Sequence, residues 1–229
     1  MRYVYLPPLF DENKCSYRFG YCLKKHLDSM GIELERFDYR GTGEAKGKFC
    51  DVTLESLKDD VEGFIDGDNC TAIGVRFGAS LGFDVCCGAV ESAKKLILIE
   101  PIIVGADYLR WLERSQAVKN TITAAGEQNL DEAGYMNIEG YKTSEFFLSQ
   151  LERFSLLKNV EKLPDDISLH IGNIDSSANN QRIEQLCSLL KDKGKQYCLE
   201  KIDAVQFWRR IGIGDYSKAV EKIGDWCNE

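Results

Sequence analysis

The sequence has 229 residues, of which 44% are apolar and 29% charged, and its formal net charge is −8. This composition excludes intrinsic disorder and predicts one large domain or two small ones with a full apolar core. The negative charge disfavours nucleic acid and anionic membranes as partners. No apolar run reaches the ~18 residues of a membrane-spanning helix, and the first residues lack the features of a signal peptide, so we expect a cytoplasmic protein without a membrane span.

Strands and helices are expected to alternate through the first hundred residues. The stretch 3–10 is predicted to begin as a strand that ends at the double proline Pro7 and Pro8. Further strands are predicted at 32–39, 71–75 and 95–101. The predicted helices are 13–30, 53–66 with Thr53 as its cap, and 81–90. Short strands linked by helices of this length predict an α/β fold with a mostly parallel, doubly wound sheet of about six strands.

The alternation stops between about 102 and 160. Two amphipathic helices, 106–119 and 143–158, are expected there, separated by a polar stretch at 126–140. An insertion at this point would lie over the carboxyl ends of the strands, where ligands bind in such sheets. We therefore interpret 102–160 as a small helical lid within a single domain, 1–229.

The alternating pattern resumes after Pro164. The predicted elements are strands at 167–171 and 196–202 and helices at 179–193 and 215–227. The nine cysteines form no C-x-x-C pair and no cluster with histidine, so the sequence predicts neither a metal site nor a cofactor. We interpret them as reduced thiols that pack as small apolar side chains.

The stretch that carries the chemistry is the turn after strand 71–75. A strand–turn–helix with the pattern G-x-S-x-G presents a nucleophilic serine on a sharp turn between glycines. Here the same frame reads Gly74-Val75-Arg76-Phe77-Gly78, with arginine in the place of serine. A literal G-x-S-x-G occurs at 78–82, around Ser80, but that register would draw Arg76 and two glycines into a central strand. We therefore place Arg76 at the turn and Ser80 one turn into the helix.

The order of elements and several motifs resemble α/β-hydrolases of the serine aminopeptidase-like type. These motifs are FDYRGTGE at 37–44, the turn at 74–78 and HIGNIDSS at 170–177. A closer resemblance is to the exosortase-system-associated hydrolases. It is carried by YLPPLFDENK (5–14), GVRFGA (74–79), LILIEPIIVGADYLRWLER (96–114), GYKTSEFFLSQL (140–151) and the FW pair at 207–208. The resemblance implies an α/β-hydrolase fold in the neighbourhood of acyl and cell-surface polysaccharide metabolism.

The resemblance also assigns the positions of a catalytic triad. The nucleophile position falls on Arg76, the acid position on Asp175, and the histidine position near Phe207 and Trp208, where the sequence has no histidine. An arginine is charged at all relevant pH values and cannot act as the nucleophile. The expectation is a degenerate triad, typical of a pseudoenzyme.

Three functions stay open at this point. The first is a protein that binds or non-classically processes a small anionic or acyl-bearing ligand, or a peptide, in a cleft under the lid. The residues expected to bind that ligand are Arg76, Phe77, Leu9, Phe10 and Trp208. The alternative for Arg76 itself is an internal salt bridge with Asp175.

The second function is an ester, thioester or peptide hydrolase that uses a displaced Ser80 with His170 and Asp175. It requires Ser80 and His170 to lie within hydrogen-bond reach.

The third function is that of a structural partner protein whose cleft is filled by its own side chains.

Overall fold

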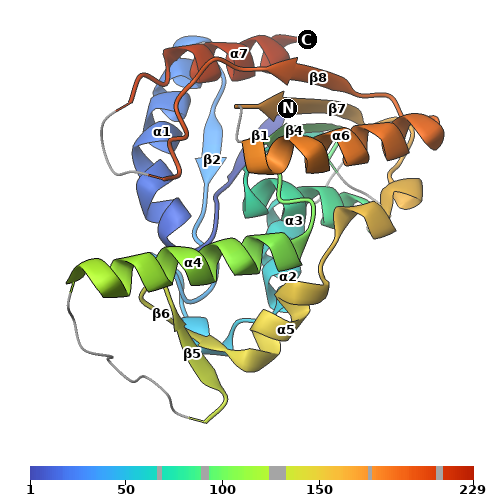
Figure 1. Cartoon of the computed structure of the whole chain (residues 1–229). Coiled ribbons are helices and arrows are strands. Elements are labelled where there is room, and N and C mark those ends of the chain that lie inside the picture. The colour runs from blue at the N-terminus through green and yellow to red at the C-terminus, as the bar shows by residue number, and fades with distance from the viewer. Residues whose placement is uncertain (66–68, 89–92, 124–132, 175–176, 210–213) are drawn as a thin grey trace. The chain divides into compact units, whose positions relative to one another are not determined.

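The computed structural model describes residues 1–65, 69–88, 93–123, 133–174, 177–209 and 214–229 (Figure 1). The chain divides into two compact units. The larger, the sheet unit, comprises Met1–Phe37, Val61–Ile103 and Leu156–Glu229. The smaller, the small unit, comprises Asp38–Asp60 and Val104–Ser155. Within the described ranges, no helix combines the length and the apolar character needed to cross a membrane.

The sheet unit contains a parallel sheet of six strands with helices on both faces. The strand order is β2-β1-β3-β4-β7-β8. The strands are β1 (Arg2–Leu6), β2 (Leu34–Arg36), β3 (Cys70–Val75), β4 (Lys95–Ile99), β7 (Ser168–Asn173) and β8 (Cys198–Lys201). β3 and β4 are buried along their whole length, as their continuous apolar sequence requires for central strands. The predicted α/β fold with a parallel sheet of about six strands is confirmed.

The two faces of this sheet are covered by different helices. Ile73, Ile97 and His170 are partners in neighbouring strands, so they point to one face. Helices α1 (Phe10–Ser29) and α7 (Ser217–Asn228) pack together on that face (Figure 1). Gly74, the next residue along β3, points to the opposite face, where a Cβ in its place would lie 2.4 Å from Cα of Ala79 in α3 (Phe77–Cys86).

Several predicted boundaries shift. The first strand ends at Leu6, directly before the two prolines that were expected to stop it, whereas the helix predicted from 13 already begins at Phe10. The strand predicted at 32–39 is only Leu34–Arg36. Helix α2 (Leu54–Ile65) is capped as expected, since the Thr53 hydroxyl accepts a hydrogen bond from the Ser56 N–H at 3.1 Å. Helix α6 (Ser177–Asp192) lies close to its predicted range.

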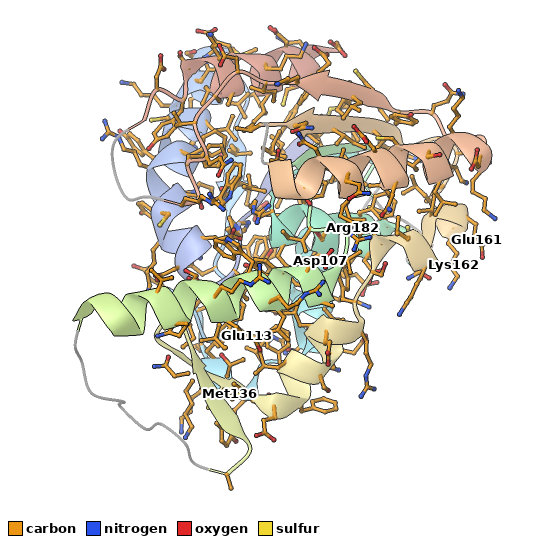
Figure 2. The ribbon with its side chains drawn as sticks, viewed as in Figure 1. Asp107, Glu113, Met136, Glu161, Lys162 and Arg182 are labelled. Atoms are coloured by element: carbon orange, nitrogen blue, oxygen red, sulfur yellow. The ribbon has the colours of Figure 1, made fainter. Side chains whose placement is uncertain are left out.

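The small unit contains a hairpin that the sequence analysis missed. Residues Val104–Ser155 of this unit form α4 (Gly105–Thr123), β5 (Tyr135–Ile138), β6 (Tyr141–Ser144) and α5 (Glu145–Arg153), and β5 and β6 make up the hairpin. The two strands pair antiparallel around Glu139 and Gly140, which both have positive φ, as a tight hairpin turn requires. Met136 projects from β5 with 39% of its surface exposed (Figure 2). The helix predicted at 143–158 is shorter because Ser144 caps it from the end of β6.

Candidate functional site

The turn between β3 and α3 forms a strained backbone corner at Arg76, with φ 54° and ψ −122°. Both flanking glycines are required, since a Cβ at Gly74 would clash with Ala79 and one at Gly78 would lie 2.3 Å from the Leu6 carbonyl oxygen. The Arg76 N–H donates to the Ile99 carbonyl at 2.9 Å. The structure therefore agrees with the predicted register, which places Arg76 at the corner and Ser80 inside α3.

The Arg76 side chain is buried in a charged cluster. Its Nε donates to Glu12 Oε1 at 2.9 Å, and its Nη1 donates to the Glu100 carbonyl at 3.4 Å and lies 4.0 Å from Glu100 Oε2. The guanidinium carbon stands 5.1 Å from the centroid of the Trp208 ring, a cation–π contact. The three charged side chains are 8%, 1% and 0% exposed, in the order Arg76, Glu12, Glu100. Burial of this degree strengthens the attraction within the cluster and makes it costly to remove one partner.

The two carboxylates reach Arg76 from distant parts of the chain. Glu12 lies in the first turn of α1, just after Phe10, whose φ is 55°. Glu100 directly follows β4 with φ 48°, and its Oε1 accepts the Ile174 N–H at 2.7 Å. Its Oε2 accepts from Asn179 Nδ2 of α6 at 3.0 Å. The sequence analysis missed both glutamates, although an acidic residue just beyond an apolar strand was an available signal.

Ser80 has no access to solvent. Its side chain is fully buried in α3, and the hydroxyl donates to the Ile102 carbonyl at 2.8 Å, with the Arg76 carbonyl at 3.1 Å. Helix α3 covers the face of the sheet to which Gly74 points. The hydrogen bond from Ser80 to Ile102 therefore links α3 to the segment that follows β4.

His170 lies on the other face of the sheet, under α7. Its Nε2 is 3.1 Å from the Ser168 hydroxyl, its Nδ1 is 3.9 Å from Glu229 Oε2, and its ring stands 5.3 Å from the Trp226 ring. Burial, and secondly the positive charge of Lys95, lower the pKa of His170 below its usual range. The structure does not bring Ser80 and His170 together.

The other predicted site residues that the structure describes are buried as well. Leu9, Phe10, Phe77 and Trp208 are each at most 2% exposed. Phe207 stacks on Phe19 of α1, with ring centroids 3.7 Å apart, which places the FW pair in the core. Asp175, predicted at the acid position and as a partner of Arg76, lies outside the described residues.

The Cys87 thiol, directly after α3, does not supply an alternative nucleophile. Burial and the nearby Asp84 carboxylate raise the pKa of the Cys87 thiol to about 12, so it stays protonated at neutral pH. No disulfide joins any of the nine cysteines, all of which lie in described segments. A guanidinium fixed by carboxylates can donate hydrogen bonds to a ligand, but it cannot attack a carbonyl carbon.

Comparison with solved structures identifies the fold. Monoacylglycerol lipase from Paleococcus ferrophilus matches with a TM-score of 0.61 and 16% identity, covering 98% of this chain and 93% of that one. A lipase-esterase related protein from Clostridium acetobutylicum matches with a TM-score of 0.62 and 14% identity over 99% and 93%. Mouse α/β hydrolase domain-containing protein 10 matches with a TM-score of 0.58 and 15% identity over 99% and 89%. This chain therefore has the α/β-hydrolase fold.

Comparison of the sequence itself gives no match to a protein-family model or to a curated protein. Identities of 14–16% to the solved structures establish the fold and leave the reaction undetermined. The function must therefore be argued from the residues at the β3–α3 corner.

Proposed function

We propose that this α/β-hydrolase-fold protein binds a small anionic or acyl-bearing ligand, or a peptide, at the β3–α3 corner and does not hydrolyse it through a serine. The proposal includes a degenerate triad, with Arg76 at the nucleophile position, Asp175 at the acid position and no histidine after the last strand. It also includes a lid formed by 102–160, most of which belongs to the small unit. A cytoplasmic location stays a prediction.

The observation that carries the proposal is the 2.9 Å contact between Arg76 Nε and Glu12. This hydrogen bond fixes the Nε side of the guanidinium at the position that carries the nucleophile in the G-x-S-x-G turn. The Nη1 contact to the Glu100 carbonyl is long, at 3.4 Å, and a ligand oxygen could replace it at little cost. Arginine suits carboxylate and acyl oxygens because its donors form a rigid planar fork.

The first experiment tests for a serine nucleophile. The wild type and Ser80→Ala are incubated with a fluorophosphonate probe, and their intact masses are measured. We expect no adduct on either protein, because the Ser80 hydroxyl is buried and bonded to backbone carbonyls. A single adduct on the wild type that disappears in Ser80→Ala would overturn the proposal and establish a serine hydrolase.

The second experiment tests for the ligand. Acetate, butyrate and octanoate are titrated into the wild type and into Arg76→Lys, and the unfolding midpoint is followed. We expect the midpoint of the wild type to rise with at least one acyl anion, and the rise to be smaller in Arg76→Lys, which keeps the charge but loses the fork.

A structural partner protein with a filled cleft is the second candidate. The burial of Phe207 and Trp208, each 2% exposed, favours it, because both aromatic side chains already pack near the corner. It predicts that none of the three acyl anions shifts the midpoint and that no small molecule copurifies with the protein in native mass spectrometry. The two candidates therefore give opposite results in the titration.

A further inference from the structure

An open cavity of about 290 Å³ lies in the sheet unit, between α1 and the start of α7. These two helices pack side by side (Figure 1). Pockets for small molecules have volumes of about 300–1,000 Å³, so this cavity suits a ligand at the small end of that range. The residues that the argument uses are Arg18, Cys22, Asp215, Tyr216, Ser217 and Val220.

Helix α1 supplies one wall of the cavity. Arg18 and Cys22 are four residues apart, so they lie on the same face of this helix. A guanidinium is charged at all relevant pH values and has five N–H donors, so it can bind a carboxylate in addition to its contacts within the protein. The α1 wall therefore brings a positive charge and a half-buried thiol to the cavity.

The segment that leads into α7 supplies the other wall. The Asp215 carboxylate accepts the Ser217 N–H at 2.9 Å, which holds it beside a second lining residue. Hydrogen bonds from Ser217 keep the pKa of Asp215 below its usual range, so this carboxylate is negative at neutral pH. Among the described residues, no lysine or arginine lies at ion-pair distance from it.

The cavity therefore carries two opposite charges that do not form an ion pair with each other. A simple anion would be attracted by Arg18 and repelled by Asp215, and a simple cation would meet the reverse. A molecule with both charges is attracted by both groups. Tyr216 and Val220, which are 5% and 6% exposed, add an apolar surface for a short carbon skeleton.

We propose that this cavity is a second binding site, and that it takes a small zwitterion of the α-amino acid class. The ligand carboxylate accepts hydrogen bonds from Arg18, its ammonium group donates to Asp215, and its side chain contacts Tyr216 and Val220. Because Arg76, Glu12 and Glu100 do not line the cavity, the site is independent of the function proposed for the β3–α3 corner.

The first test compares three matched ligands by calorimetry on the full chain, at constant ionic strength. L-Leucine carries both charges, isocaproate lacks the ammonium group, and isopentylamine lacks the carboxylate. We expect L-leucine to bind most tightly, and its dissociation constant to rise about three- to fivefold in Arg18→Gln and in Asp215→Asn. Arg182→Gln and Asp166→Asn are the controls for the loss of one charge and should change nothing, because neither residue lines the cavity (Figure 2 labels Arg182).

The thiol of Cys22 gives an independent measure of where the ligand binds. L-Leucine in the cavity should slow the alkylation of Cys22 by iodoacetamide several-fold, as followed by peptide mass mapping. Cys50 is the control, because it is also half-buried but belongs to the small unit, and its alkylation rate should stay the same. This measurement needs only the wild type, so it remains decisive if a variant does not fold.

Several results would overturn the proposal. One is equal binding of L-leucine and isocaproate, and another is no binding of L-leucine at all. A third is L-leucine binding that is weakened by Arg76→Lys while Cys22 stays unprotected, which would place the ligand at the β3–α3 corner. Protection of Cys22 with unchanged binding in Arg76→Lys supports the proposal even if the corner binds no acyl anion.

Discussion

Arg76 and Arg36 lie in the same sheet unit, but their guanidinium groups contact different kinds of side chain. Arg76 is enclosed by two buried carboxylates and a tryptophan ring, and its Nε is hydrogen-bonded. Arg36 is enclosed by two tyrosine rings, and its Nε is unpaired. The first arrangement is an ion pair between buried side chains, whereas the second places a guanidinium against aromatic rings. The comparison therefore predicts that the loss of Arg76 costs more stability than the loss of Arg36.

The largest expected effect follows from breaking the completed cluster. Arg76→Met leaves Glu12 and Glu100 buried without their cation, and we expect the free energy of unfolding to fall by about 3–5 kcal/mol. Arg36→Met removes no ion pair between described residues and should change the free energy of unfolding by less than about 1 kcal/mol. Urea denaturation of both variants measures the difference.

The double variant Glu12→Gln with Arg76→Met sharpens the first comparison. Because it removes an opposite charge together with the guanidinium, part of the lost stability should return. Similar losses in Arg76→Met and Arg36→Met would show that the carboxylates around Arg76 are not energetically coupled to it.

The sequence was sufficient for the local features of this molecule. The apolar run and the glycine spacing place Arg76 at the corner, and the alternation of strands and helices predicts the parallel sheet. The partners of Arg76 were not predictable in this way, because Glu12 and Glu100 are 64 and 24 residues away and meet it only through the order of the strands. The β5–β6 hairpin was missed for a different reason, since its turn places Glu139 at positive φ before Gly140, and Glu-Gly is not one of the dipeptides that typically signal a hairpin.

An intermediate effect is expected at Ser80, below the Arg76 corner. Ser80→Ala removes a fully buried hydroxyl that fastens α3 to Ile102, and we expect a loss of about 1 kcal/mol in the free energy of unfolding. Ser29→Ala is the matched control, because that hydroxyl also bonds a helix carbonyl but is exposed, so its loss should cost less than about 0.5 kcal/mol. Equal losses would mean that burial adds nothing to the Ser80 contact.

The smallest effect concerns His170, whose Nδ1 is a further buried atom without a hydrogen-bond partner. Lys95, Glu229, Glu200 and Lys222 face this ring, and burial together with Lys95 lowers its pKa from the ordinary value of 6.5. The unfolded chain therefore binds a proton near pH 6.5, whereas the folded protein binds it only at lower pH. Stability should fall as the pH decreases from 7.5 to about 5.5.

The variant His170→Gln should lose this part of the pH dependence. The control His26→Gln, which removes the only other histidine of the chain, should keep it. Thermal unfolding midpoints measured across that pH range provide the comparison. A steeper decline in His170→Gln than in the wild type would mean that protonated His170 gains more from Glu229, 3.9 Å away, than it loses through burial. In that case His170 would resemble Arg76, a cation completed by its own carboxylate, more than Arg36.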